Sequence, residues 1–160
     1  MSRKKVAGIG LAVVIVLVAV GGLAATKSAG REPDFRAMQA EVDKAWCSLH
    51  AENAAPFYAK GPDNVFFDVA PLKYQGWAEY QAGAQKLFLD GARSMKFIPK
   101  GDDHVTRSGD VAWMTRTLRI SADMKEGKPL ELDCRDTVLW IRQGGKWLIA
   151  HEHVSAPLPE

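Results

Sequence analysis

The sequence predicts an α+β domain in which helices come first and a meander of strands follows, behind a hydrophobic leader helix. Three observations lead to this prediction. Apolar side chains recur at helical spacing between residues 34 and 50, whereas residues 95–156 contain runs of β-branched and aromatic residues separated by turn signals. An uncharged apolar run at residues 6–25 precedes both. With 160 residues, the chain is long enough for one domain with a core of its own.

The first 25 residues are expected to direct the chain out of the cytoplasm. Basic residues at positions 3–5 precede the apolar run 6–25, which is about long enough to cross a bilayer. That length favours a retained signal anchor, whereas the small residues at its end suit cleavage by signal peptidase, so both outcomes stay open. In either case the folded part is expected to be extracytoplasmic: periplasmic, secreted, or anchored to the membrane by residues 6–25.

Composition argues against several classes of function. The first thirty residues carry four of the 21 basic side chains and none of the 19 acidic ones, so the remainder is slightly acidic. No polybasic face with interleaved aromatic residues is present, which argues against a nucleic-acid partner. The sequence lacks G-x-S-x-G, a phosphate-binding glycine loop and C-x-x-C, so esterase, nucleotide-binding and redox functions are disfavoured and no cofactor is expected.

Residues 26–33 form a short polar linker, and Asp34 is well placed to cap a helix that runs to about His50. The apolar stripe of this helix consists of Phe35, Met38, Val42, Trp46 and Leu49. Cys47 projects away from the stripe, which favours two unlinked thiols over a disulfide to Cys134, although an exported protein could form one.

A second, short helical turn is expected from Asn53 to the break at Gly61, followed by a strand at 65–69. Gly76 then begins another helix, which ends near Gly91. Its apolar residues at helical spacing are Trp77, Tyr80, Ala84, Leu87 and Phe88.

The rest of the chain predicts four strands joined as a meander. They cover residues 95–107, 110–122, 130–142 and 146–156. Ser108-Gly109, residues 125–129 and Gly144-Gly145 provide the turn signals between them.

Three stretches carry a resemblance to a known family. The ending TVLWIRQGGKWLIAHEHVSAP is similar to the closing hairpin of the calcium/calmodulin-dependent kinase association domain, and GDVAWMTRTLRIS at 109–121 matches its preceding central strand. The stretch FFDVAPLKYQG at 66–76 resembles the SnoaL-like pattern in which an Asp ends the first strand. Residues 34–157 therefore resemble the SnoaL-like branch of the nuclear transport factor 2-like superfamily.

The resemblance implies a curved antiparallel sheet that N-terminal helices wrap into a cone, with a pocket between the sheet and the first helix. Such domains are usually homodimers or higher homo-oligomers. The superfamily includes ketosteroid isomerases, polyketide cyclases, dehydratases and plain binding or assembly domains, so the fold alone does not select one function.

The turn of the closing hairpin decides which acids share the pocket. A three-residue loop at 143–145 sets Asp136 opposite Glu152, whereas a two-residue loop sets Asp136 opposite a histidine. We favour the longer loop, because the pocket positions of the resembling domains correspond to Val138 and Val154, which have the parity of the two acids. Facing carboxylates repel, so one of them should keep a proton at raised pKa or meet a cation.

Arg119 is the expected cation. It corresponds to an arginine that lines the pocket of the association domains, and the turn at 125–129 folds it back towards Asp136. A structural ion pair at the wide end of the cone is the alternative role for this arginine.

A more distant resemblance to ketosteroid isomerase implies an acid–base site. Asp68 corresponds to the general base of those enzymes, and Asp136 falls within one residue of their second, protonated Asp. Their donor tyrosine falls near Trp46, so Tyr58 is the candidate for the missing hydroxyl. Turn formation by Asp68 and core packing by Tyr58 are the structural alternatives.

The remaining pocket candidates are apolar. Trp113 and Trp140 share the pocket parity with Val138 and Val154, which favours a small apolar or planar organic ligand. The H-x-H pair at 151–153 faces away from the pocket in this register, and no metal site is expected.

We therefore expect an extracytoplasmic SnoaL-like domain that binds a small organic molecule in a conical pocket and forms homo-oligomers. The alternative is an acid–base isomerase, cyclase or dehydratase in which Asp68 is the general base. A purely structural assembly module for a membrane partner is the third possibility.

Overall fold

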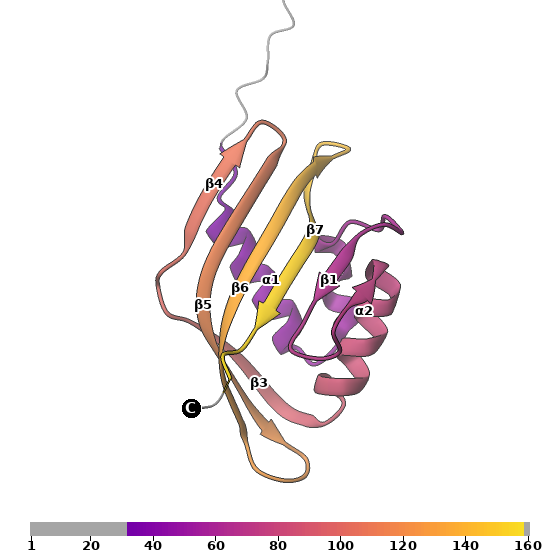
Figure 1. Ribbon diagram of the computed structural model, residues 1–160, viewed down its shortest axis with the longest axis vertical. Helices are drawn as coiled ribbons and strands as arrows, with labels where there is room; N and C mark the ends of the chain where they lie inside the picture. The colour runs from indigo at the N-terminus through magenta and orange to yellow at the C-terminus, as the bar shows by residue number, and fades with distance from the viewer. Residues whose placement is uncertain (1–31, 159–160) are drawn as a thin grey trace, which may run out of the picture. The chain divides into compact units, whose positions relative to one another are not determined.

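The helices come first along the chain and the long strands follow (Figure 1), which confirms the α+β plan. The computed structural model describes residues 32–158. The leader at 1–25 and most of the linker lie outside these residues, so the membrane segment stays a prediction. Within residues 32–158, no helix combines the length and apolar character that crossing a bilayer requires.

Helix α1 spans Phe35–Cys47 and starts where the sequence predicts. Asp34 caps it, because a carboxylate oxygen of Asp34 accepts the Ala37 N–H at 3.0 Å. The buried residues of α1 are Phe35, Gln39, Val42, Asp43, Ala45 and Trp46. Two polar side chains, Gln39 and Asp43, therefore share the face that was expected to be apolar.

Short elements connect α1 to the long strands. They are the 3₁₀ helix η1 (Ala51–Phe57), strand β1 (Val65–Phe67), strand β2 (Tyr74–Gln75), helix α2 (Gly76–Ala84) and the π-helical turn η2 (Gln85–Leu89). The second helix begins at Gly76, as predicted. Strand β1 is shorter than the predicted 65–69, so Asp68 lies directly after it.

Five strands complete the sheet: β3 (Ala92–Pro99), β4 (His104–Ser108), β5 (Val111–Met124), β6 (Leu130–Gln143) and β7 (Lys146–Ser155). The prediction of one strand at 95–107 is wrong, because the chain leaves the sheet at 100–103. There the Asp102 carboxylate accepts the Thr117 backbone N–H at 2.8 Å and the Thr117 hydroxyl at 2.7 Å. Both β3 and β4 pair with β5. In the connection between them, the Asp102 side chain bonds to β5 in place of the backbone.

The strands form one sheet in the order β2-β1-β7-β6-β5-β3, and β4 pairs with the free half of β5. One pair departs from the expected antiparallel pattern, because β1 runs parallel to β7 with Phe66 beside Glu152. A sequence pattern can identify a strand, but it does not show which strand far along the chain becomes its neighbour. The parallel pairing of β1 with β7 could therefore not be predicted from the residues of β1.

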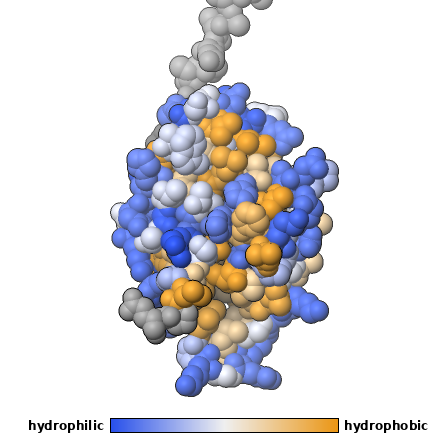
Figure 2. All heavy atoms as spheres, in the orientation of Figure 1, coloured by the Kyte–Doolittle hydropathy of each residue, from blue (hydrophilic) through white to orange (hydrophobic). Residues whose placement is uncertain are grey.

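Helices α1 and α2 cover one face of the curved sheet, here called the inner face, and the opposite outer face is turned towards the viewer in Figures 1 and 2. Aromatic packing fills the space beneath the helices. Tyr58 stacks on Trp77 with ring centroids 4.3 Å apart, and Phe66 stacks on Tyr80 at 4.9 Å. These aromatic side chains belong to the hydrophobic core.

The β6–β7 turn is shorter than predicted. Gly144 and Gly145 have φ values of 58° and 80°, and Gln143 pairs with Lys146 across them. The expected three-residue loop at 143–145 is therefore wrong. Two consecutive glycines can both take positive φ without steric strain, which is the condition for a two-residue turn of this kind.

The short turn alone would exchange the two faces of β7 relative to the prediction. A β-bulge farther along the hairpin restores the predicted faces. Strand β7 carries one extra residue, Ala150, between the residues that pair with Leu139 and Trp140 of β6. Beyond this bulge, Asp136 and Glu152 point to the same face, as predicted. They are diagonal neighbours, however, and do not lie directly opposite each other.

Cys47 and Cys134 are unlinked thiols, as the helix geometry favours. Burial raises the pKa of Cys134 to about 11, and nearby carboxylates add to the shift. Because the two thiols are unlinked, no disulfide joins α1 to the sheet. The polar contacts between α1 and the sheet come from other side chains.

Candidate functional site

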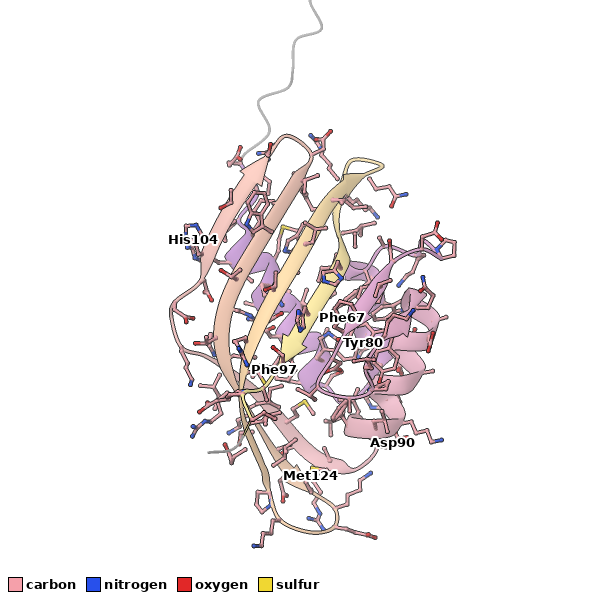
Figure 3. All side chains as sticks on the ribbon, in the orientation of Figure 1. Phe67, Tyr80, Asp90, Phe97, His104 and Met124 are labelled. Atoms are coloured by element: carbon pink, nitrogen blue, oxygen red, sulfur yellow. The ribbon has the colours of Figure 1, made fainter. Side chains whose placement is uncertain are left out.

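A cavity of about 180 Å³ lies between the helices and the inner face of the sheet. Tyr80 from α2 and Phe97 from β3 belong to its wall (Figure 3). Other apolar side chains in the wall are Phe88, Leu89, Met95, Leu118 and Leu132. Its charged or ionisable side chains, besides Tyr80, are Asp68, Arg116, Asp136 and Glu152. A mostly apolar wall with a few convergent polar groups is typical of a small-molecule site.

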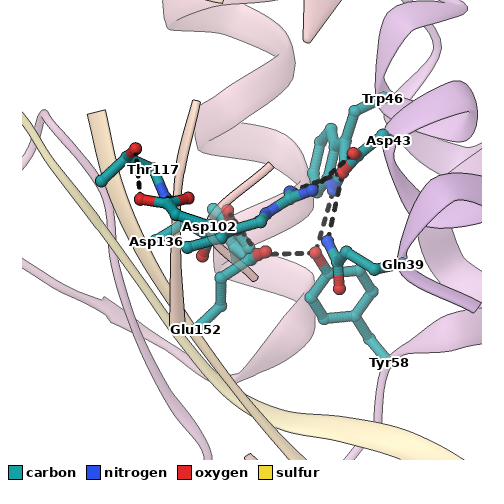
Figure 4. Close-up of polar contacts among 10 residues, drawn as sticks. Gln39, Asp43, Trp46, Tyr58, Asp102, Thr117, Asp136 and Glu152 are labelled. Carbon is teal, nitrogen blue, oxygen red and sulfur yellow. Dashed lines mark hydrogen bonds and ion pairs between the residues drawn. The ribbon is translucent and has the colours of Figure 1, made fainter. Parts of the chain in front are cut away.

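One guanidinium and two carboxylates form a buried ion cluster between α1 and the sheet (Figure 4). Arg116 donates from both terminal nitrogens to the two carboxylate oxygens of Asp43, each at 2.6 Å. Its Nε donates to Oδ2 of Asp136 at 2.8 Å. Gln39 adds a hydrogen bond to Asp43 at 3.2 Å. The cluster therefore connects α1 to β5 and β6 and holds Asp136 in the cavity wall.

Glu152 is buried on β7 and accepts two phenol hydrogen bonds. The hydroxyls of Tyr58 and Tyr80 donate to its Oε2 at 2.6 Å and 3.1 Å. The Trp46 indole N–H donates in turn to the Tyr58 hydroxyl at 2.9 Å (Figure 4). Burial, followed by the nearby Asp136 carboxylate, raises the pKa of Glu152 to about 8, against the opposing effect of the phenols. Glu152 therefore keeps its proton at neutral pH.

Asp68 follows β1 directly and is half-buried in the cavity wall. Its Oδ1 accepts the Val69 N–H at 2.7 Å, a contact within its own turn. Burial is the main cause that raises the pKa of Asp68 to about 6; the Val69 N–H opposes this shift and Asp136 adds to it. At neutral pH Asp68 is ionised, and it is a stronger base than an exposed Asp.

Asp136 has one oxygen without a hydrogen-bond partner. Oδ2 accepts the Arg116 Nε–H, whereas Oδ1 is buried and has no partner within residues 32–158. Burial raises the pKa of Asp136, and Arg116 opposes the rise. Glu152 keeps the proton, because Arg116 donates a hydrogen bond to Asp136 and acts on Glu152 only through its charge, which burial outweighs.

The structure brings half of the predicted site residues to this one cavity. Those that line it are Trp46, Asp68, Asp136, Glu152 and Val154. Tyr58 contributes through its hydrogen bond to Glu152. Val138 and Trp140 lie on the same face of β6, but they are fully buried in the core beside the cavity. They therefore pack in the core and do not line the cavity, contrary to their predicted contact with a ligand.

Arg119 and Trp113 were expected in the pocket, and their predicted placement is wrong. Arg119 is on the outer face, where it pairs with Asp133 at 2.7 Å. Trp113 is also on the outer face and is 38% exposed. On β5 the buried side chains from 112 to 118 are the even-numbered ones, so both residues point outward.

Three functional candidates in the structure, Arg116, Asp43 and Tyr80, were not predicted from the sequence. Arg116 has the parity of the buried apolar residues of β5, and Asp43 belongs to the buried face of α1. A charged residue inside an apolar series is the signal that could have identified both. Tyr80 was counted only as an apolar residue of its helix, although a buried phenol normally has a hydrogen-bond partner.

The two histidines of the H-x-H pair lie outside the cavity. Nδ1 of His151 is 2.6 Å from the Val65 carbonyl oxygen. The imidazoles of His151 and His153 each contact the ring of Phe67, with centroids 5.4 Å apart (Figure 3). Across residues 32–158, no three His, Cys, Asp or Glu side chains come together in a way that could hold a metal ion.

The sequence model of the SnoaL-like domain family matches residues 35–159. No curated protein matches the chain in sequence.

Several solved structures share its fold. A nuclear transport factor 2-like superfamily protein from Salmonella enterica superposes with a TM-score of 0.69 at 13% identity, covering 76% of this chain and 87% of the other. A candidate calcium/calmodulin-dependent protein kinase II association domain from Xanthomonas campestris gives 0.68 at 21% identity, with coverages of 81% and 91%. A candidate dehydratase of the same fold family from Streptomyces avermitilis gives 0.67 at 17% identity, with coverages of 78% and 94%. At these identities the similarity is one of fold.

Proposed function

The chain belongs to the SnoaL-like domain family, which confirms the resemblance in its sequence, and from this we propose that it binds a small organic molecule in the cavity. One observation supports the proposal above all. An apolar wall and a set of buried acids meet in a single cavity of about 180 Å³, and one buried oxygen of Asp136 lacks a donor. Apolar surface provides affinity for the body of a ligand, and the acids orient its polar group.

Filling the cavity tests the proposal. Ala84 lines the cavity on α2, whereas Ala82 on the same helix is exposed. We expect Ala84→Leu to weaken the binding of small aromatic alcohols, ketones and amines at least about tenfold, because added methyl groups occupy the ligand's volume. Ala82→Leu, the matched control, should bind like the natural protein. Ligand-observed NMR measures both, and equal binding by the two variants would exclude this cavity as the site.

The second candidate is acid–base catalysis, which the two perturbed acids favour. Asp68 has a pKa of about 6 and Glu152 one of about 8, so at neutral pH one is a base and the other an acid in the same cavity wall. Asp68 would take a proton from the carbon beside a carbonyl group. The electron pair of the C–H bond would move towards the carbonyl oxygen, to which Glu152 would donate its proton. Tyr58 and Tyr80 would hold Glu152 in place.

Deuterium exchange into phenylacetone in D₂O, followed by NMR, tests this chemistry. The rate should rise through about pH 6 as Asp68 ionises and fall above about pH 8 as Glu152 loses its proton. Asp68→Asn should lose the catalysed exchange, and Asp63→Asn, exposed in the preceding turn, should retain it. Unchanged exchange in Asp68→Asn would remove Asp68 as the base.

We also propose that the domain acts outside the cytoplasm, on the strength of the apolar run at residues 6–25. Mass spectrometry of the N-terminus of the protein from its source distinguishes a cleaved leader from a retained anchor. A full-length protein in the soluble cytoplasmic fraction would contradict both.

A further inference from the structure

Positive charge is scarce in the cavity wall. Within the described residues, Arg116 is the one cationic side chain that lines the cavity, and it stands beside three carboxyl side chains, those of Asp68, Asp136 and Glu152. All three guanidinium nitrogens of Arg116 already donate to Asp43 or Asp136, at 2.6–2.8 Å. Each terminal nitrogen keeps one further N–H, but the single positive charge of Arg116 already faces the carboxylates of Asp43 and Asp136, so a carboxylate or phosphate ligand would add negative charge and be repelled by the acids. The cavity is therefore unsuited to an anion.

The wall also contains a buried hydrogen-bond acceptor that no donor reaches within residues 32–158. Oδ1 of Asp136 is buried in the wall without a partner in the described part of the chain, and Asp136 as a whole is only 2% exposed. A buried acceptor in this state costs free energy until a donor reaches it. Asp68 adds a second, half-buried carboxylate to the same wall. A ligand that brings both donors and positive charge would satisfy the two groups together.

We infer that the ligand carries a protonated amine on a small apolar body, an inference that rests on the binding function proposed above. The ammonium group donates to Asp136 and Asp68, and the body lies against Leu118 and Leu132. A metal cation would not fit in the same way, because residues 32–158 bring no three ligating side chains together and the rest of the wall is apolar.

Calorimetric titration at pH 7 with probes that share one body tests the inference. Phenethylamine, phenethyl alcohol and hydrocinnamate share the phenethyl body and carry a cationic, a neutral and an anionic head group. We expect the amine to bind at least about tenfold more tightly than the alcohol, since charge-assisted hydrogen bonds are roughly twice as strong as neutral ones. Hydrocinnamate should not bind measurably. Hexylamine, hexanol and heptanoate repeat the comparison with a linear body.

Two variants test whether Asp68 causes the preference for the amine. Asp68→Asn should weaken phenethylamine binding about tenfold and leave the alcohol unaffected, because it removes a charge but keeps the shape. Asp133→Asn, on the outer face of β6, should change neither. If the alcohol or the carboxylate binds as tightly as the amine, the inference is overturned while small-molecule binding stands. If no probe of either series binds, the proposed function falls and the inference falls with it.

Discussion

At the scale of single residues, Arg116 and Arg119 lie three positions apart on one strand, but their ion pairs contribute differently to stability. Both lie on β5 and pair with an aspartate of β6, Arg116 with Asp136 and Arg119 with Asp133. The Arg119–Asp133 side chains are 49% and 41% exposed, so water and salt offset most of their attraction. The Arg116–Asp136 side chains are 4% and 2% exposed, and neither charge can be left without its partner.

Methionine substitution should therefore have very different costs at the two positions. Arg116→Met leaves Asp43 and Asp136 buried without a cation, and we expect it to lower the free energy of unfolding by about 3–5 kcal/mol. Arg119→Met removes only an exposed pair and should cost less than about 1 kcal/mol. Urea denaturation at pH 7 measures both variants. Similar losses would mean that the buried cluster is not what holds α1 to the sheet.

Glu152 should make the protein less stable as the pH rises. Its pKa, raised from an ordinary 4.5 to about 8, means that the folded state holds this proton more tightly than the unfolded state does. The resulting stabilisation is complete below about pH 4.5 and is lost as the pH rises through about 8. Glu152→Gln cannot ionise, and its amide oxygen still accepts the phenols of Tyr58 and Tyr80.

Between those pH values, the natural protein should therefore lose stability relative to Glu152→Gln, by at most about 1.4 kcal/mol per pH unit. Asp68 and Asp136 titrate in both proteins, so the difference between the two isolates Glu152. Chemical denaturation at a series of pH values gives this difference. Glu126→Gln, at an exposed turn position, is the control and should track the natural protein. A constant difference across the range would show that Glu152 is ionised in the fold.

At the scale of elements, the hairpin β6–β7 combines a short turn with a bulge. The turn at Gly144-Gly145 alone would set Asp136 opposite His153 and turn Glu152 outward. The extra residue Ala150 corrects this by one position, so that Glu152 returns to the inner face. The bulge, and not a long loop, is thus what aims the two acids into the cavity.

Deleting and adding residues in β7 tests this account. Ala150 has no partner on β6, so its deletion joins Ile149 to His151 and leaves every pair of the hairpin in place, with Glu152 still on the inner face. An alanine inserted between His151 and Glu152 instead shifts the rest of β7 by one residue, turns Glu152 outward and should cost more than about 3 kcal/mol. We expect the melting temperature to fall much further in the insertion than in the deletion. Equal losses in the two variants would show that the register depends on contacts elsewhere in the sheet.

At the scale of the whole folded unit, the helices cover one face of the sheet and leave the outer face open. Figure 2 shows this face with apolar side chains in patches among polar ones. Trp113 is 38% exposed there and lies in a row across the strands with Thr106 and Leu139. An exposed tryptophan on an open sheet face suits contact with a second copy of the chain, as expected for a homodimer.

Sedimentation velocity of the purified protein over a range of concentrations tests self-association. We expect a dimer, and we expect Trp113→Lys to raise its dissociation constant at least about tenfold, because truncating an interface tryptophan commonly costs about 2 kcal/mol or more. Leu87→Lys, an exposed position on η2 at the helical side, should leave the dimer intact. A monomer at every concentration would contradict the prediction.

The sequence by itself determined the features that depend on neighbouring residues. The cap at Asp34 and the helical period defined the start and buried face of α1, and Gly76 marked the start of α2. Turn residues separated the long strands. The family resemblance placed Asp136 and Glu152 on one face, although the loop that was assumed with it was wrong and the bulge at Ala150 was not predicted. The other features follow from local conformational preference or from side-chain periodicity, which act over a few residues.

Only the tertiary structure decided which cation meets Asp136, which acid keeps its proton, and which tryptophan faces outward. A shift of one residue exchanges the two faces of a strand, so Arg116 and Arg119 could not be distinguished without the register between β5 and β6. The same register and the bulge at Ala150 bury Glu152 beside Tyr58 and Tyr80. Burial sets the pKa values, and burial depends on segments that lie far apart in the chain and meet only when it folds.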